Sequence, residues 1–236
     1  MSYYSSNTNS EITRIFIIRH GQTDHNIQKI FQGHRDIPIN QEGFEQADNL
    51  GEFLKNKKHI TSFDKIYSSD LIRCKQTLGE ILKNVTVKDK DKDIEYSQAL
   101  RERYMGIIEG MHLDAAEKYA LENGKTSFRD YGETLDDFHK RLSGKIVDIF
   151  ENDISDEHIN NIAIISHGGA IRNILHWLDK INDYYDNKHK VVVYNTSVTI
   201  VDFNNKTKTF EIKEVGNTDH LGEGQFVVQD TKLRWR

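Results

Sequence analysis

The chain has 236 residues, of which 36% are hydrophobic and 29% are charged, and its formal net charge is −5 at pH 7. This composition allows a sizeable core and gives no bulk attraction for nucleic acid or an anionic membrane, so we expect neither as a partner. The single cysteine, Cys74, excludes an internal disulfide and is typical of a reducing compartment.

The N-terminal segment, residues 1–10, has neither a basic start nor an apolar core, so we do not expect a secretory signal. We predict a short disordered tail there and a cytoplasmic protein. No apolar run reaches the roughly 18 residues that a membrane span needs. Residues 11–236 contain no repeat and no Pro/Gly/Ser-rich linker, which predicts a single domain.

Two apolar runs end in a His-Gly pair. The first, residues 15–18, is followed by Arg19-His20-Gly21, and the second, residues 162–165, is followed by Ser166-His167-Gly168. Both runs are typical of buried strands in an α/β sheet. Ligands bind beyond the carboxyl ends of such strands, so we expect the two histidines to meet there. The alternative is that each histidine only caps its strand.

The region after the first motif combines a loop, a helix and a strand. Residues 31–40 contain Gly33 and the only proline, which indicates an irregular loop that either forms a wall of the pocket or is a plain connector. Residues 41–56 have a helical apolar stripe, and residues 63–67 are typical of a short strand. We predict that Ser68-Ser69 caps the next helix.

Arg73 falls in the first turn of that helix. A surface salt bridge is the ordinary role of such an arginine, but its place just beyond a strand favours anion binding. We predict an exposed loop at residues 88–93, with short β-like runs on either side. Residues 100–110 then place two carboxylates, Glu102 and Glu109, among arginines.

The second half of the chain is expected to alternate helices with strands. We predict a helix over 112–123 and another over 134–149, with Thr134 as its N-cap. After the strand at 162–165, a helix over 170–175 would place His167 beside a helix N-terminus, which attracts anions. Two further strands, 191–203 and 210–215, would form a hairpin.

These groups suit phosphoryl chemistry. Arg19, Arg73 and His167 form a set of donors for a tetrahedral dianion, and neutral His20 is a nitrogen nucleophile. Neighbouring positive charge favours the neutral imidazole. Glu102 is the candidate proton donor to the leaving group and the candidate base for the water that follows. Two histidines and a carboxylate could instead hold a metal, but the two arginines would repel a cation, so we expect no metal and no cofactor.

The motifs that carry these residues resemble those of the histidine phosphatase superfamily, the phosphoglycerate mutase-like group. The Arg-His-Gly-x-Thr-x-x-Asn motif corresponds to residues 19–26, and the Gln-Gly loop to Gln32-Gly33. Three further motifs correspond to residues 68–77, 100–110 and 166–169. This resemblance implies a three-layer αβα sandwich with a mostly parallel central sheet and helices on both faces.

The resemblance also implies residue roles. His20 would be the phospho-acceptor and Glu102 the proton donor, while Arg19, Arg73 and His167 would hold the phosphate. The residues that would contact a small-molecule phosphate ester are Gly21, Thr23, Asn26, Gln32, Gly33, Arg103 and Gly168.

Within the superfamily the chain resembles the TIGAR-type fructose-2,6-bisphosphatases, in residues 100–104, 132–136 and 195–198. This resemblance implies that fructose 2,6-bisphosphate is the substrate. Mutases of the group carry a longer insertion after the acid motif, whereas residues 111–131 contain neither proline nor tryptophan. A more open pocket favours hydrolysis. A phosphoglycerate mutase, a broad-specificity phosphatase and a binding module without turnover remain open, as does the oligomeric state.

Overall fold

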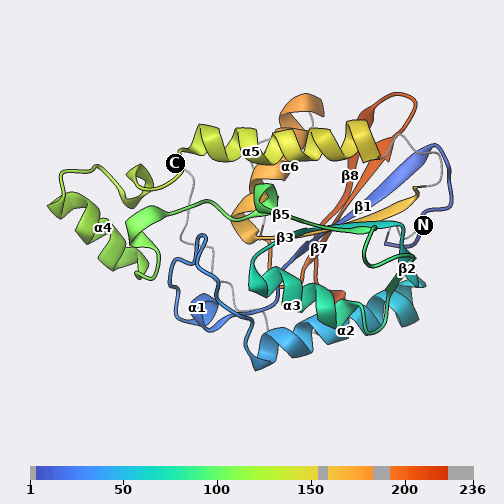
Figure 1. The fold of residues 1–236 in the computed structure, drawn as a ribbon, viewed down its shortest axis with the longest axis horizontal. Helices are drawn as coiled ribbons and strands as arrows, with labels where there is room; N and C mark the ends of the chain where they lie inside the picture. The colour runs from blue at the N-terminus through green and yellow to red at the C-terminus, as the bar shows by residue number, and fades with distance from the viewer. Residues whose placement is uncertain (1–3, 154–158, 183–191, 223–236) are drawn as a thin grey trace.

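The computed structural model describes residues 4–153, 159–182 and 192–222 (Figure 1). Six strands form one sheet in the order β5-β3-β6-β1-β7-β8. Four of these strands are parallel, and β7 and β8 are antiparallel to their neighbours. The strands are β1 (Ile12–Arg19), β3 (Lys65–Ser69), β5 (Ile94–Ser97), β6 (Asn161–Ser166), β7 (Val198–Asn204) and β8 (Thr209–Asn217). The expected α/β fold with a mostly parallel sheet is confirmed.

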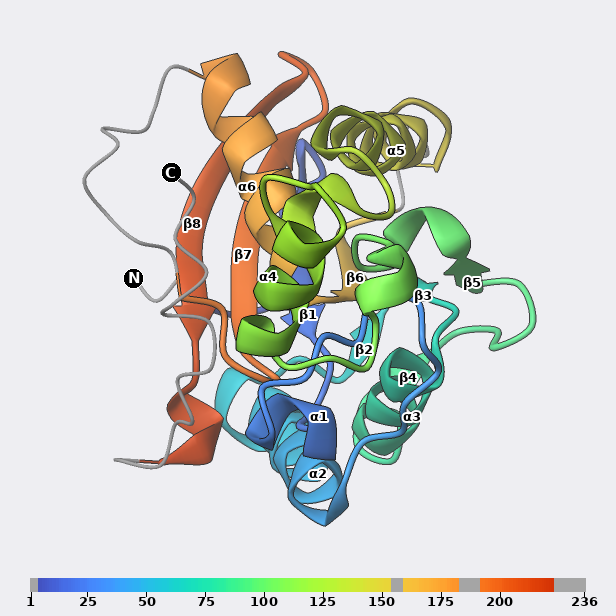
Figure 2. The ribbon, with the colours of Figure 1, turned by 90° about the vertical axis from the view of Figure 1, so that its left-hand side faces the viewer.

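Helices cover both faces of the sheet. On one face lie α2 (Gln41–Lys58) and α3 (Ile72–Ile81), and on the other α5 (Leu135–Asp148) and α6 (Gly168–Asn182) (Figures 1 and 2). Alternate side chains of a strand point to opposite faces. In β1, Phe16 and Ile18 therefore join the core against α2 and α3, while Ile15 and Ile17 join the core against α5 and α6. Burial of these two apolar faces fixes the three layers.

The remaining elements lie at the edges and in the connections. They include the short helix α1 (Asp24–Ile27), the helix α4 (Leu113–Glu122) and a two-stranded sheet of β2 (Ser62–Phe63) and β4 (Thr86–Val87). The predicted β-like runs beside residues 88–93 correspond to β4 and β5. No helix in the described part of the chain is long and apolar enough to cross a membrane.

The register of the two central strands brings the His-Gly pairs together. Strands β1 and β6 run parallel, with Ile18 opposite Ile165 and Arg19 opposite Ser166. His20 and His167 therefore leave the same edge of the sheet side by side. The backbone N–H of His20 donates to the carbonyl of Ser166 at 3.0 Å, which continues the ladder to that point.

Several boundaries differ from the expectations. The predicted strand 63–67 is interrupted at Asp64, and its second part, β3, continues through Ser69. The predicted N-cap pair Ser68-Ser69 is therefore strand, and helix α3 has Leu71 as an N-cap without a side-chain bond. The Asp36 carboxylate instead accepts from the N–H of Ile72, 36 positions later. Tertiary contact thus caps this helix.

The expectation for residues 1–10 was wrong for the part that is described, and residues 1–3 lie outside it. Tyr4 is buried, and its ring packs beside Phe16 and Phe53. The N–H of Asn7 donates to the side-chain oxygen of Asn161 at 2.7 Å. Residues 4–10 therefore pack against the domain, because the buried Tyr4 ring and long-range hydrogen bonds between Asn7 and Asn161 hold them there.

The C-terminal hairpin is confirmed as β7 and β8, but β7 begins only at Val198. Of the predicted strand 191–203, residue 191 lies outside the described residues, and residues 192–197 form a loop with a turn. In the long helix, Thr134 is the N-cap, as predicted, and its Oγ1 accepts from the N–H of Asp137.

Candidate active site

The candidate nucleophile is His20, which follows the last residue of β1 and is only 3% exposed. Its Nδ1 lies 2.7 Å from the carbonyl oxygen of Gly21. A carbonyl can only accept, so Nδ1 carries the proton and Nε2 keeps its lone pair. Burial, followed by the charges of Arg73 and Arg19, holds the pKa of His20 well below 6.5. The ring is therefore neutral at physiological pH and able to attack.

The second histidine lies against the first, with 5.2 Å between the ring centroids. The Nε of Arg73 donates to Nδ1 of His167 at 3.1 Å, and the other ring nitrogen, Nε2, lies 2.9 Å from the Ser69 hydroxyl. Burial, then the charges of Arg73, His20 and Arg19, keeps the pKa of His167 well below 6.5. His167 is thus neutral, with Nε2–H pointing to Ser69 because Nδ1 already accepts.

Arg73 joins this pair to the loop after α1. Arg73 is 1% exposed, and its guanidinium donates to the carbonyl oxygens of Gly33 and Arg35, each at 2.8 Å. An arginine buried among backbone carbonyls stays charged and holds a fixed orientation. The loop predicted at residues 31–40 is therefore fastened to the cationic centre and forms a wall of the pocket.

The loop at 192–197 fixes the backbone of the candidate nucleophile by hydrogen bonds. The side-chain amide of Asn195 donates to the carbonyl of His20 at 2.9 Å, and the N–H of Thr196 donates to the carbonyl of Arg19 at 3.1 Å. Arg19 Nη1 donates to the carbonyl of Val193 at 2.6 Å. The prediction of one strand over residues 191–203 missed this loop. The pair Asn195-Thr196, which favours a turn, was the signal that could have identified it.

The candidate acid, Glu102, lies on a loop and faces the N-terminus of α6. Its Oε2 accepts from the N–H of Gly169 at 2.8 Å, and its Oε1 accepts from the N–H of Arg103 at 3.0 Å. A Cβ on Gly169 would lie 2.4 Å from Oε1. The second glycine of the His-Gly-Gly sequence is therefore required for the approach of the carboxylate, a role that the sequence did not reveal.

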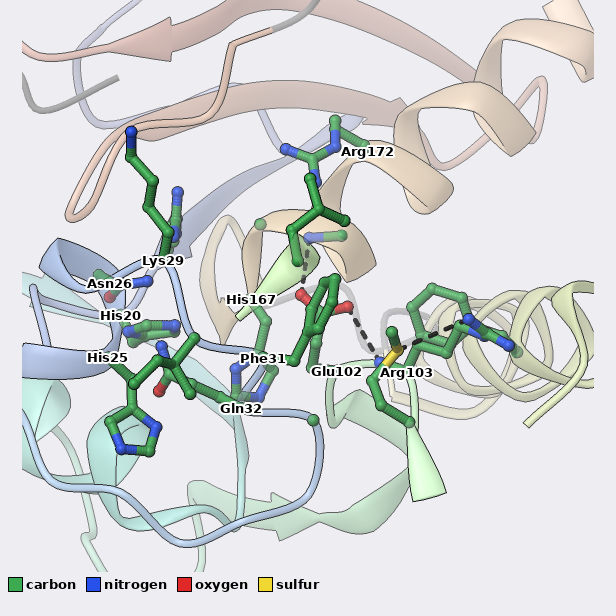
Figure 3. Close-up of a pocket in the computed structure, with 18 of the residues that line it drawn as sticks. His20, His25, Asn26, Lys29, Phe31, Gln32, Glu102, Arg103, His167 and Arg172 are labelled. Atoms are coloured by element: carbon green, nitrogen blue, oxygen red, sulfur yellow. Dashed lines mark hydrogen bonds between the residues drawn. The ribbon is translucent and has the colours of Figure 1, made fainter. Parts of the chain in front are cut away.

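These groups line one pocket of about 250 Å³ (Figure 3). The most deeply buried polar side chains of the lining form its base: His20, His167, Arg19 and Arg73. Figure 3 shows Glu102 to one side of the two histidines. The rest of the lining combines apolar and cationic side chains that the sequence did not single out as pocket residues: Lys29, Ile30, Phe31, Met105, Leu113, Phe128, Arg129, Leu135, Phe138 and Arg172. Phe31 and Phe128 stack with centroids 4.8 Å apart. The pocket thus combines an anion-binding cluster with apolar walls.

Five of the predicted contact residues line this pocket: Asn26, Gln32, Gly33, Arg103 and Gly168. Gly21 does not, and a Cβ on it would lie 2.6 Å from the carbonyl oxygen of Gly43, so it serves close packing against α2.

Two further residues predicted to contact substrate, Thr23 and Arg103, make hydrogen bonds within the protein instead. Thr23 is fully buried as the N-cap of α1 and does not line the pocket. Arg103 reaches the lining, but its guanidinium donates to the carbonyls of Arg129, Tyr131 and Glu133. It fastens the segment before α5, because three backbone acceptors converge there.

The described residues contain no group of three His, Cys, Asp or Glu side chains placed to hold a metal ion. The two arginines beside the histidines instead make the base of the pocket cationic. An oxyanion such as a phosphoryl group is the ligand that such a donor set fits.

Comparison with known proteins gives a consistent result. Residues 15–218 match the model of the histidine phosphatase superfamily (branch 1). The chain is 50% identical to a broad-specificity phosphatase of Saccharomyces cerevisiae, over 98% of this chain and 97% of that protein. It is 41% identical to the fructose-2,6-bisphosphatase TIGAR of Bos taurus, over 57% of this chain and 48% of that protein.

Among solved structures, a phosphoglycerate mutase from Bacillus anthracis has a TM-score of 0.73 to this structure. The two are 27% identical, and the match covers 94% of this chain and 99% of the mutase chain.

Proposed function

The chain belongs to the histidine phosphatase superfamily (branch 1), and on that premise we propose that it hydrolyses small phosphate monoesters through a phosphohistidine on His20. The observation that carries the proposal is the hydrogen bond from His20 Nδ1 to the Gly21 carbonyl, inside a cationic pocket that also contains Glu102. It leaves a neutral Nε2 as the nucleophile.

In the first step, Nε2 of His20 attacks phosphorus and the bond to the ester oxygen breaks. The guanidinium groups of Arg19 and Arg73 hold the non-bridging oxygens while charge redistributes, and His167 orients Arg73 by accepting from its Nε. Glu102, protonated in this step, gives its proton to the departing alkoxide. The products are the free alcohol, the phosphohistidine and the Glu102 carboxylate.

In the second step, water attacks the phosphorus of the phosphohistidine. The Glu102 carboxylate takes a proton from that water, and the P–N bond breaks to return neutral His20 and inorganic phosphate. Glu102 thereby regains the proton that it gave up. No step calls on a metal, so we expect activity to persist in excess chelator.

The range of substrates is proposed to be broad. Support comes from the 50% identical yeast relative, whose name describes a broad-specificity phosphatase, and from apolar side chains in the pocket lining, which suit varied alcohol groups. Fructose 2,6-bisphosphate is a second candidate, because two further cations of the pocket lining, Lys29 and Arg172, could attract a second phosphate. A bovine relative also carries that activity in its name.

The test is to incubate the purified protein with ³²P-labelled substrate, quench it in alkali and measure label on the chain. We expect an acid-labile, alkali-stable phosphoenzyme in the unaltered protein and none in His20→Ala. Activity that depends on added Mg²⁺, or labelling that persists in His20→Ala, would overturn the proposal.

Steady-state kinetics on a panel of phosphorylated sugars and glycolytic intermediates then separates the substrate hypotheses. Comparable kcat/KM values across the panel support broad specificity, whereas a preference of about 10²-fold or more for fructose 2,6-bisphosphate supports the second candidate. Conversion of 3-phosphoglycerate to 2-phosphoglycerate, primed by a bisphosphate and without release of phosphate, would indicate a mutase.

A further inference from the structure

The loop that carries Glu102 is held by an arginine from another layer of the fold. Arg141 lies on α5, and its Nη1 donates to the carbonyl oxygens of Gln98, Ala99 and Arg101 at 3.3, 2.8 and 3.1 Å. Its Nη2 donates to the carbonyl of Glu102 itself at 3.2 Å. One guanidinium thus contacts four carbonyls in the five residues that end at the candidate acid.

Arg141 is itself fixed by a two-pronged ion pair. Its Nε and Nη2 donate to the two carboxylate oxygens of Glu133 at 2.7 and 2.8 Å. The pair is partly buried, with 22% and 13% of the two side chains exposed. Such a fork fixes the plane of the guanidinium, which a single lysine ammonium cannot reproduce.

Glu133 also holds the residues on the C-terminal side of Glu102. Its backbone N–H donates to the carbonyl of Tyr104 at 2.9 Å, and its own carbonyl accepts from Nε of Arg103 at 2.7 Å. The residues on both sides of Glu102 are therefore connected to the Glu133–Arg141 pair. Neither residue of the pair lines the pocket, so neither touches a substrate there directly.

We propose that Arg141, oriented by Glu133, is a positioning residue that directs the Glu102 carboxylate toward the leaving group. The inference rests on the proposed role of Glu102 as proton donor. The direction of that carboxylate follows the backbone of residues 101–103, which carries the Arg141 contacts. A displacement of about 1 Å in such a group can cost roughly 10²-fold in rate.

The dependence of rate on the leaving group separates this role from a merely structural one. An alkoxide is a strong base and needs a proton as it departs, whereas p-nitrophenolate departs with little help. The kcat/KM value covers only the steps through the first phosphoryl transfer. Misdirection of the acid therefore lowers kcat/KM for glycerol 2-phosphate much more than for p-nitrophenyl phosphate. General loosening of the fold lowers both values together.

The experiment compares Arg141→Lys, Glu133→Gln and Glu102→Gln with the unaltered protein on both substrates. Lys140→Gln is the control for a substitution on the same helix, because Lys140 is the exposed neighbour of Arg141 on α5. We expect Arg141→Lys and Glu133→Gln to lose at least tenfold more kcat/KM on glycerol 2-phosphate than on p-nitrophenyl phosphate. Lys140→Gln should match the unaltered protein on both.

Equal losses on the two substrates, or no loss on either, would overturn the inference. If Arg141→Lys fails to fold, Glu133→Gln decides, since it keeps the size of the side chain and removes only the charge. Glu102→Gln identifies which proposal fails. If it shows the leaving-group dependence and the other two variants do not, only the positioning role is wrong. If Glu102→Gln does not show it, the proposed proton donor is wrong.

Discussion

The ring of His20 donates from Nδ1 to the carbonyl oxygen of Gly21, the next residue along the chain, at 2.7 Å. This contact assigns the proton to Nδ1 and the lone pair to Nε2, because a backbone carbonyl oxygen can accept a hydrogen bond but cannot donate one. It also fixes the ring at the base of a pocket that contains two arginines and a second histidine. The chemistry expected of the site depends on this tautomer.

The pH dependence of the reaction should reflect the environment of His20. Burial and the charges of Arg73 and Arg19 hold its pKa well below 6.5, so acidification to pH 6 leaves the nucleophile neutral. We expect the acid limb of log kcat/KM, corrected for ionisation of the substrate, to lie well below pH 6.5. Arg19→Gln should move that limb upward, because it removes a positive charge. A limb at 6.5 or above in the unaltered protein would contradict the assignment.

Replacement of the acid should separate the two chemical steps. Glu102→Gln keeps the size of the side chain but can neither give nor take the proton. We expect kcat/KM on an alkyl phosphate to fall by about 10²–10⁴-fold. The phosphoenzyme formed from p-nitrophenyl phosphate should live longer than in the unaltered protein, as measured by alkaline quench after a labelling pulse. A phosphoenzyme lifetime equal to that of the unaltered protein would argue against Glu102 as the base.

Substitution of Gly169, which faces the Glu102 carboxylate, tests whether the position of that carboxylate matters for catalysis. Gly169→Ala places a methyl group 2.4 Å from the unmoved Oε1 of Glu102, so the carboxylate must shift. Because Gly169 is helical, alanine should not harm the helix. We expect kcat/KM on glycerol 2-phosphate to fall by about 10²-fold with little change in Tm.

The control for that substitution is Gly79→Ala, an exposed helical site in α3 where an added Cβ meets nothing within 4 Å. It should leave kcat/KM unchanged and raise stability by about 0.5–1 kcal/mol. Full activity in Gly169→Ala would show that the position of the carboxylate is not critical.

Stability in acid should depend on His220. Burial lowers its pKa to about 4, against a smaller opposing effect of Asp219, while its Nε2 lies 2.8 Å from the Thr196 hydroxyl. Between pH 6.5 and 4 the unfolded chain therefore binds a proton that the folded chain does not, and stability falls as pH falls. At pH 5 the cost is up to about 2 kcal/mol, or roughly 4–8 °C in Tm.

Thermal melts at pH 7.5 and pH 5 check this expectation. His220→Gln should lose less Tm on acidification than the unaltered protein, whereas His176→Gln, which removes an exposed histidine, should behave like the unaltered protein. An identical drop in all three proteins would show that other groups govern acid stability.

The sequence by itself determined the frame of the site. The apolar runs before His20 and His167, and the apolar stripes of α2, α5 and α6, are local patterns with the periods of strand and helix. Two parallel strands that end in His-Gly predict neighbouring histidines, and the register of β1 and β6 confirms it. The cationic set of Arg19 and Arg73 followed from the same reasoning.

Only the tertiary structure decided how that set is oriented. The loop at 192–197 behind His20, the approach of Glu102 to Gly169 and the contacts of Arg141 each join segments that are far apart in the chain. Most of these contacts end on backbone N–H or C=O groups, which every residue carries and which therefore leave no mark in the sequence. Their partners are set by the packing of the layers. His20 and Glu102 could therefore be named in advance, but neither their geometry nor the part played by Arg141 could.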